Sequence, residues 1–438
     1  MMMKEGFANL LLVLAVVCPV GAEEAWEIRA DWSETRQVGE KFLKVWGGGT
    51  TFEDLADSIW IAADSARAWV DGDRCLFGPG VTLQVPSRKV YADTLEYYWQ
   101  SKTAIFKGHV QSQEKTRRLA ADKVIYDLEQ DLLEIPGALV FDFLEEGFQL
   151  NATHMRYFAL QDSGLIGQGA EVRKFPSNGE DTLVIRADSL VFTQHGDRLA
   201  FSESVLLTQG KMVAQADRVL FLRPDSLVLL EDHARISWIR YQGTLTDTVV
   251  ALANRIRARM AAGEIREIEM YTDVQIDIFR SQEGKQTIRA DTARVIWTGE
   301  TVEGLEATGQ VHLTLKDADG AETDLRGDRL AMAFKEGDLD SLLLRGNCSG
   351  IYVSEEGKTE NRLSGGQQTI WFDSEKISRI QVEDNAECEQ VPRDETENRI
   401  RVTGDRVVLQ FEAGKLQEVV ALGGVKGSYQ SREEENLP

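Results

Sequence analysis

The sequence predicts an all-β fold, an elongated stack of about twelve repeated strand-pair units. Three observations support this prediction. A short motif recurs every 29 to 39 residues, apolar residues alternate with polar ones inside each copy, and turn-forming residues separate the copies. A single strand pair cannot bury its apolar face alone, so stacked copies would share one continuous core with polar groups outside.

The recurring motif has the form Ala-Asp-x-apolar-x-aromatic. Its clearest copies begin at Ala92, Ala121, Ala187 and Ala216, and Ile-Arg-Ala-Asp occurs at both 185–188 and 288–291. Looser copies extend the series along nearly the whole chain. The predicted unit starts are Asp31, Asp64, Asp93, Asp122, Thr153, Asp188, Asp217, Asn254, Asp291, Asp328, Gln367 and Asp405.

A second signature, a glycine followed by alternating apolar residues, lies about 15 to 18 residues after the first, as at Gly108 and Gly309. The alternation has a period of two, which is typical of strands. Val124 and Tyr126 therefore face one side of their strand, and Lys123 and Ile125 face the other. Each unit is predicted to have one mostly apolar face.

The inward positions of these units are candidates for an apolar, lipid-binding groove. Periodicity does not distinguish a groove that is open along one side from a closed, dry core, so both interpretations stay open. The candidate lipid-groove residues are Leu95, Tyr97, Val124, Tyr126, Met155, Tyr157, Leu190, Phe192, Val219, Phe221 and Trp297.

The repeated acidic residue invites a metal-binding or catalytic interpretation. However, three of the twelve positions carry the uncharged residues Thr153, Asn254 and Gln367. A hard metal ion would require clustered, charged oxygen ligands. We therefore expect each of these side chains to cap a backbone N–H where a strand starts.

Composition excludes several functions. The chain has 49 Lys and Arg against 72 Asp and Glu, a net charge of −23. Nucleic-acid binding requires a basic surface, so no nucleic acid is expected as a partner. The motifs GxSxG, HExxH and CxxC are absent from the sequence, and its five histidines are dispersed. We expect a protein that is not an enzyme and that uses no cofactor and no metal.

The N-terminus has the features of a secretory signal at residues 1–22. Lys4 precedes an apolar stretch from Phe7 to Val17, and Ala22 ends a small-residue cleavage site. Lipidation at Cys18 and retention as a membrane anchor are the alternatives. The predicted organisation is a signal peptide at 1–22, continuous repeats at 23–430 and an acidic tail at 431–438, in a protein exported to the periplasm.

Three cysteines follow the predicted cleavage site, Cys75, Cys348 and Cys388. Cys348 and Cys388 are 40 residues apart, about one repeat, and both are expected to point inward on adjacent units. Their diagonal pairing is marginal for a disulfide. We expect partial or no bridging.

The order Ala-Asp-x-Val-x-Tyr, a turn, then Gly-x-Val-x-apolar resembles the OstA-like family. This family includes the periplasmic lipopolysaccharide-transport proteins LptA and LptC and the N-terminal domain of LptD. Residues 121–141, 152–172 and 187–207 carry the resemblance best. It implies a V-shaped, solenoid-like β-jellyroll whose interior holds the acyl chains of lipopolysaccharide, and members that join edge to edge across the periplasm.

Together these observations predict a periplasmic lipid-binding bridge between the inner and outer membranes. Because the chain is acidic, recognition of lipopolysaccharide or a related lipid would depend on acyl chains, at about 25 cal/mol per Å² of buried apolar surface. Each end of the stack would accept a strand from an inner-membrane or outer-membrane transport protein. The alternatives are a structural envelope scaffold with a closed core and a polysaccharide-active β-helix enzyme.

Small-angle scattering tests the stacked architecture. If each unit adds two strand spacings, twelve units give a particle about 115 Å long. A compact domain of 438 residues would have a radius of gyration of about 22 Å. We expect a clearly larger value, and a value near 22 Å would contradict the repeat stack.

Overall fold

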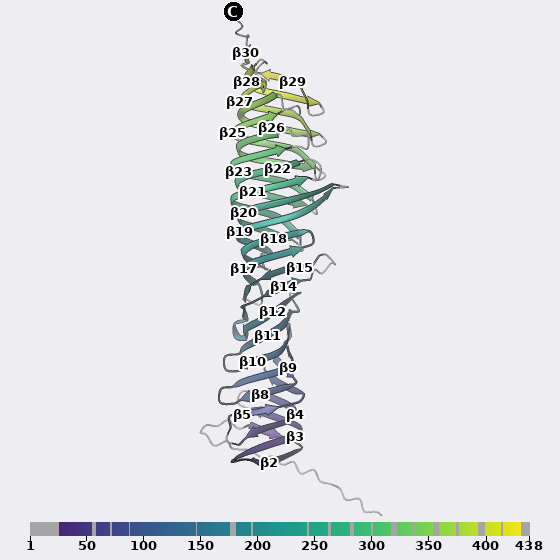
Figure 1. Cartoon of the computed structure of the whole chain (residues 1–438), viewed down its shortest axis with the longest axis vertical. Helices are drawn as coiled ribbons and strands as arrows, with labels where there is room; N and C mark the ends of the chain where they lie inside the picture. The colour runs from purple at the N-terminus through teal and green to yellow at the C-terminus, as the bar shows by residue number, and fades with distance from the viewer. Residues whose placement is uncertain are drawn as a thin grey trace, which may run out of the picture. The chain divides into compact units, whose positions relative to one another are not determined.

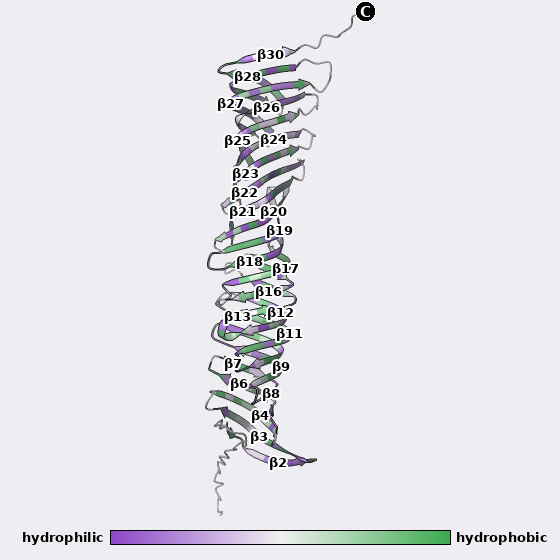
Figure 2. Ribbon diagram, turned by 90° about the vertical axis from the view of Figure 1, so that its left-hand side faces the viewer, coloured by the Kyte–Doolittle hydropathy of each residue, from purple (hydrophilic) through white to green (hydrophobic). Residues whose placement is uncertain are grey.

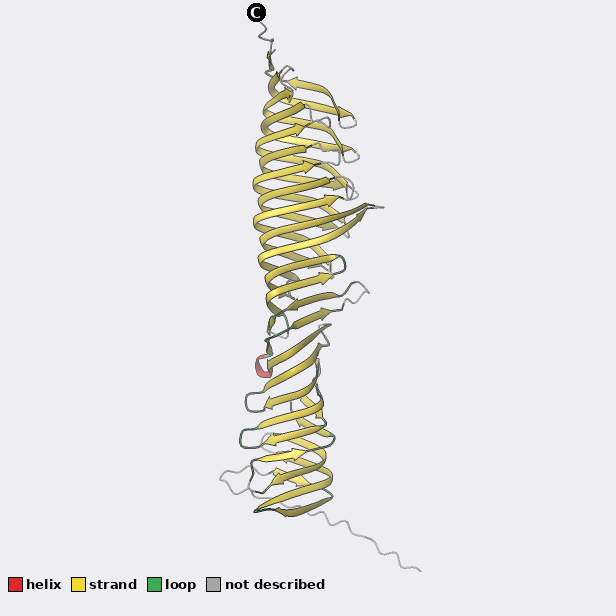
Figure 3. Ribbon diagram, viewed as in Figure 1, coloured by secondary structure: helices red, strands yellow, loops and turns green. Residues whose placement is uncertain are grey.

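A computed structural model describes residues 26–54, 58–70, 72–86, 88–145, 147–175, 181–193, 196–242, 245–261, 264–280, 284–298, 301–316, 322–335, 338–353, 359–373, 376–392, 399–412 and 415–430. These residues form thirty strands and one 3-10 helix, and every strand pair is antiparallel (Figure 3). The predicted all-β, repetitive fold is confirmed. The predicted signal peptide and acidic tail lie outside the described residues.

The chain divides into two compact units, residues 1–199 and 200–438, and in each the strands stack across the long axis of that unit (Figure 1). Unit 1 contains β1 (Trp26–Arg29), β2 (Trp32–Val38), β3 (Lys41–Asp54), β4 (Ile59–Trp69), β5 (Arg74–Phe77), β6 (Val81–Val85), β7 (Arg88–Ala92), β8 (Thr94–Tyr98), β9 (Thr103–Gln113), β10 (Arg117–Asp127), β11 (Leu132–Phe143), β12 (Phe148–Phe158), the 3-10 helix η1 (Ala159–Gln161), β13 (Ser163–Ile166), β14 (Ala170–Lys174), β15 (Leu183–Ala187) and β16 (Ser189–Thr193). Strand β17 (Arg198–Gln209) begins at the boundary. Unit 2 continues with β18 (Met212–Leu222), β19 (Leu227–Gln242), β20 (Leu245–Ala261), β21 (Glu264–Arg280), β22 (Gly284–Thr298), β23 (Thr301–Lys316), β24 (Glu322–Lys335), β25 (Asp338–Val353), β26 (Thr359–Asp373), β27 (Lys376–Pro392), β28 (Arg399–Glu412), β29 (Lys415–Leu422) and β30 (Lys426–Gln430).

Each long strand of unit 2 contains a bend near its middle. Strands β22 and β23 pair in register on both sides of the bend, but the register shifts between Arg289 and Thr292. Similar shifts interrupt the pairings from β18 through β28. An extra residue in one strand of an antiparallel pair bends that strand. The bends divide each compact unit into two walls. The first wall consists of the strand segments that precede the predicted start residue of each repeat, together with the segments that pair with them. The second wall consists of the strand segments that follow those start residues, together with their pairing partners.

The two sequence signatures meet at these bends. The backbone N–H of Asp93 donates to the carbonyl oxygen of Gly108, 2.9 Å away. Gly108 has a φ of 76°, and a β-carbon there would lie less than 3.0 Å from the Asp93 carboxylate. Glycine is therefore required both for its left-handed backbone and for space. A glycine with a positive φ lies equally close to a carboxylate at four further bends, where Gly48 meets Asp31, Gly309 meets Asp291, Gly346 meets Asp328 and Gly423 meets Asp405.

The carboxylate also contacts the residue that follows the glycine position. Nδ1 of His109 lies 2.8 Å from Oδ2 of Asp93, and the Asn347 amide donates to Asp328 at 3.0 Å. The hydrogen bond to Asp93 raises the pKa of His109 above its ordinary value. Asp93 and Asp188 do lie where a strand starts, directly before β8 and β16, whereas Asp291, Asp328 and Asp405 lie at bends inside long strands. The carboxylates of Asp93 and Asp328 contact side chains of the neighbouring strand, and their capping of a backbone N–H stays a prediction.

One predicted unit start is displaced by one residue. In β26 the bend lies at Gly366, and Gln367 is the next residue toward the second wall. A β-carbon at Gly366 would lie 2.7 Å from the β-carbon of Asp384, which has a φ of 60°. In this repeat the glycine lies on the first strand and the aspartate on the second, the reverse of Asp328 on β24 and Gly346 on β25. No acidic residue therefore marks the start of this repeat.

Alternation along the strands buries one face of each wall, and Figure 2 shows hydrophobic and hydrophilic residues alternating along the strands. In β22, Ile288 and Val295 lie on opposite sides of the bend and are both buried, whereas Arg289 and Arg294 are exposed. The outward arginines pair with carboxylates on neighbouring strands, as Arg294 does with Glu267. The apolar faces of the two walls therefore form the interior of a jellyroll-like stack.

Replacing Gly309 with alanine tests the requirement at the bends. The substitution forces a non-glycine residue to a φ of 77° and places a methyl group against Asp291. We expect a loss of about 1–3 kcal/mol in the free energy of unfolding, measured by urea denaturation. Gly304→Ala in the same strand is the control, because its β-carbon would make only an ordinary 3.6 Å contact. Equal effects of the two substitutions would contradict this account of the bends.

Candidate functional site

The candidate groove residues lie in the interior. Ten of them are at most 5 % exposed, and only Trp297 is half-buried. The ten buried residues are Leu95, Tyr97, Val124, Tyr126, Met155, Tyr157, Leu190, Phe192, Val219 and Phe221. Their inward orientation agrees with the alternation in the sequence. Their role in binding lipid stays a prediction.

Aromatic rings join the two walls of unit 1. Phe141 of the first wall lies 5.4 Å from Tyr157 of the second wall between ring centroids, and Phe143 lies 5.5 Å from Phe192. Gly164 leaves room for the Phe192 ring, which a β-carbon at this position would overlap. Offset and edge-to-face contacts of this kind add to the stabilisation from burial alone. Aromatic side chains therefore fill the interior of unit 1 where these four rings lie.

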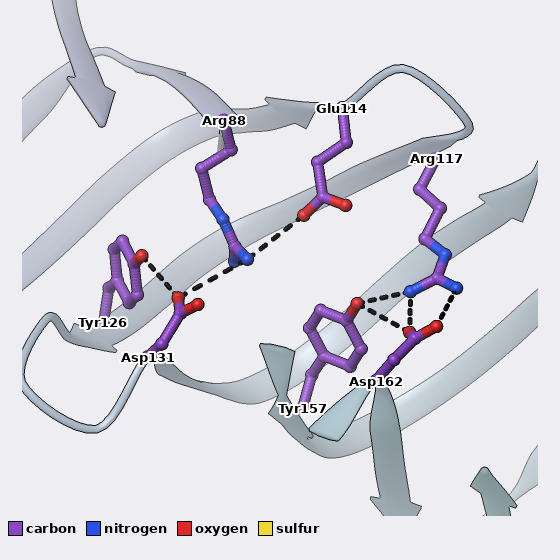
Figure 4. Close-up of polar contacts among 7 residues, drawn as sticks. All are labelled: Arg88, Glu114, Arg117, Tyr126, Asp131, Tyr157 and Asp162. Atoms are coloured by element: carbon purple, nitrogen blue, oxygen red, sulfur yellow. Dashed lines mark hydrogen bonds and ion pairs between the residues drawn. The ribbon is translucent and has the colours of Figure 1, made fainter. Parts of the chain in front are cut away.

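A buried ion pair joins the walls of unit 1 on the side opposite the bends, which we call the mouth. The side chain of Arg88 in β7 is only 2 % exposed. Its Nη2 lies 3.2 Å from Glu114 and 3.4 Å from Asp131, which belongs to the turn after β10 (Figure 4). The Tyr126 hydroxyl donates to Asp131 at 2.6 Å. Arg88 thereby connects the rim of the first wall to the rim of the second.

A second ion pair repeats this arrangement in the adjacent repeat. Arg117 in β10 pairs with both carboxylate oxygens of Asp162, which follows η1, and it donates to the hydroxyl of Tyr157 (Figure 4). The Tyr157 hydroxyl also donates to Asp162 at 3.0 Å. The guanidinium carbon lies 5.2 Å from the centroid of the Phe143 ring. We call the Arg88–Asp131 and Arg117–Asp162 groups the two clamps.

Burial fixes the protonation of the clamp tyrosines. Desolvation raises the pKa values of both Tyr126 and Tyr157 above their ordinary value, so each hydroxyl keeps its proton and can donate. A cavity of about 10 Å³ lies between the clamps, lined by residues that include Arg88, Ser112 and Tyr157. This is enough space for about one water molecule.

Sequence reasoning missed the clamps, although the sequence contains a signal for them. Tyr126 and Asp131 are separated by five positions, as are Tyr157 and Asp162. Arg88 and Arg117 each precede a unit-start aspartate by five positions. A buried arginine is expected only where a carboxylate partner is near, so an arginine at an inward position of the repeat predicts such a partner.

The rim of the second wall in unit 2 carries a row of apolar residues. Trp297, Phe334, Phe372 and Phe411 lie 37 to 39 residues apart, each half-buried at a register shift on the rim of the second wall. Their cross-strand partners are also apolar, and directly opposed residues share one face of a sheet. These partners are Val302, Leu339, Ile377 and Leu416. We call these eight residues the apolar rim.

A pair of tryptophans connects the walls of unit 2. Trp238 belongs to the first wall and Trp297 to the second, and their ring centroids are 5.8 Å apart. Both side chains are half-buried. At this level the mouth of unit 2 is bridged by apolar contact, whereas the mouth of unit 1 is bridged by ion pairs.

Cys75, Cys348 and Cys388 are free and buried. Cys348 and Cys388 face inward on β25 and β27, as predicted, and β26 separates them. Burial raises the pKa of each of these two thiols to about 11. Both therefore remain protonated and weakly nucleophilic near neutral pH.

Within the described ranges, no group of three or more His, Cys, Asp or Glu side chains is placed to hold a metal ion. No helix in this part of the chain is long and apolar enough to cross a membrane. No protein-family model matches the chain, and no curated protein matches it.

Replacing Asp162 tests the clamps. Asp162→Asn leaves the buried Arg117 without its charged partner, and breaking a buried pair in this way typically costs about 3–5 kcal/mol. We expect the free energy of unfolding of unit 1, measured by urea denaturation, to fall by this amount. The double substitution Arg117→Met with Asp162→Leu removes both charges and should recover most of the loss.

An exposed ion pair in the same unit provides the control. Arg29 lies 2.7 Å from Glu27, with the arginine side chain 61 % exposed. Glu27→Gln should change stability by at most about 1 kcal/mol. If Asp162→Asn were as mild as Glu27→Gln, the clamps would not hold the walls together.

Proposed function

We propose that this protein is a lipid-binding bridge of the cell envelope that holds acyl chains between the two walls, as in the OstA-like family. The observation that carries the proposal is the apolar rim of unit 2, which borders an apolar interior. Four half-buried aromatic residues recur along this rim at the period of the repeat. An acyl chain lying along the rim could contact several of them in succession.

The energetics favour hydrocarbon over a charged headgroup as the recognised part. Each methylene group removed from water contributes about 0.8 kcal/mol. The net charge of −23 disfavours attraction of a phosphorylated saccharide. Lipopolysaccharide or a related lipid would therefore be held mainly by its acyl chains.

The first strands of unit 1 and the last described strands of unit 2 support a bridging role. Among the described strands, β1 and β2 pair only with β3, and β29 and β30 pair only with β28. Unpaired strand edges can accept a strand from another protein. We propose that inner-membrane and outer-membrane transport proteins add to these edges, and that the protein acts in the periplasm.

The second candidate function is a structural envelope scaffold without lipid transport. The two clamps and the cross-wall aromatic contacts of unit 1 favour this alternative, because they leave the candidate groove residues of that unit buried. Under the lipid-binding proposal, unit 1 is the closed part of the protein and unit 2 is the part that receives lipid.

Site-specific photo-crosslinking in cells separates the two candidates. A crosslinker at Phe372 would sit on the apolar rim, whereas one at Trp371 would sit on the outer face, where Arg379 stacks at 4.9 Å. We expect lipid adducts at Phe372 and few at Trp371. Equal labelling at the two positions, or labelling at neither, would favour the scaffold.

A further inference from the structure

Several buried polar side chains interrupt the apolar interior of unit 2, and three of them carry polar atoms without a hydrogen-bond partner among the described residues. Gln368 in β26 is fully buried, and Tyr352 and Asn361 are 4 % and 5 % exposed. Neither amide atom of Gln368 has a hydrogen-bond partner within the described protein, and the same is true of the Tyr352 hydroxyl and of Oδ1 of Asn361. Buried polar groups are normally paired, so such a concentration requires an explanation.

These side chains are brought together by the two walls. Gln368 lies on the second wall between Leu344 and Val382, both of which are fully buried. Tyr352 and Asn361 lie directly opposite each other on the first wall. A β-carbon at Gly350 would lie 3.1 Å from Oε1 of Gln368 and 3.2 Å from the Tyr352 ring. Gly350 therefore provides the space in which the Gln368 amide reaches the first wall beside Tyr352.

The position of Gln368 is otherwise apolar along the stack. The residues at the same level of the second wall on the other strands are Val219, Leu230, Ile256, Met270, Ala293, Ala307, Leu330, Leu344, Val382 and Val407. A further leucine or valine would fill this place without the cost of burying an unpaired amide. Gln368 is therefore the polar exception in an otherwise apolar row of the second wall.

We propose that Gln368, Tyr352 and Asn361 form a polar subsite for a neutral hydroxyl or amide group carried within the hydrocarbon part of the bound lipid. This inference rests on the proposed lipid-binding function. The three side chains offer both donors and acceptors but no charge. Thr323, which lies opposite Tyr352, is buried and neutral, and Leu325 and Leu363, which lie opposite Gly350, are apolar. A charged group would lack a counterion here, whereas a hydroxyl or amide could satisfy the amide of Gln368.

A matched pair of fatty acids tests the subsite. Stearate and 12-hydroxystearate would compete with a fluorescent fatty acid for the full chain, below their critical micelle concentrations. One or two added hydrogen bonds should make the hydroxylated acid bind about 3–10-fold more tightly. Gln368→Leu should abolish this preference and leave stearate binding in place.

Two further variants control for effects on folding and space. Gln410→Leu alters an exposed glutamine of β28 and should leave the preference unchanged. Gly350→Ala adds a methyl group inside the subsite and should reduce the preference. Equal binding of the two acids to the unaltered protein, or a preference that survives Gln368→Leu, would overturn the subsite but not lipid binding. Failure of both acids to displace the probe would overturn the proposed function and the subsite together.

Discussion

The bend near the middle of each long strand is the constraint on which the rest of the structure depends. A flat antiparallel sheet of this composition would expose its apolar face, because the described residues form no α-helix or second sheet that could cover it. Bending every strand at the same level turns the two halves of that face toward each other. The pairing of Asp93 with Gly108 shows how this is done, with a left-handed glycine on one strand and an aspartate on its neighbour.

Once the strands are bent, the side opposite the bends determines what the interior can do. Unit 1 joins its walls there with arginine and aspartate pairs, which are costly to break because the arginine side chains are buried. Unit 2 carries Phe334, Phe372 and Phe411 along its rim, where apolar contacts can be exchanged for contacts with an acyl chain at little cost. Under the proposed function, the first unit has a structural role and the second unit binds lipid.

The sequence was sufficient to predict the all-β repeat and the inward orientation of residues such as Val124 and Phe192, because both follow from periodicity. Periodicity did not reveal the clamps, since Arg117 and Asp162 are 45 residues apart and meet only when the walls face each other. It also assigned a unit start to Gln367, because the glycine and aspartate of that bend have exchanged strands. The burial of Gln368 could not be anticipated for the same reason. Counting the alternation from Gln367, one residue past the actual bend, places Gln368 on the outward face of its strand.

The central claim, that lipid occupies the interior of this protein, is tested most directly by native mass spectrometry of the protein purified from its own membranes. We expect a population that carries a bound lipid. We also expect that replacing Phe334, Phe372 and Phe411 with charged residues removes this population while the protein remains folded. Detection of the lipid-free mass alone, for the unaltered protein extracted under conditions that preserve lipid complexes, would contradict it.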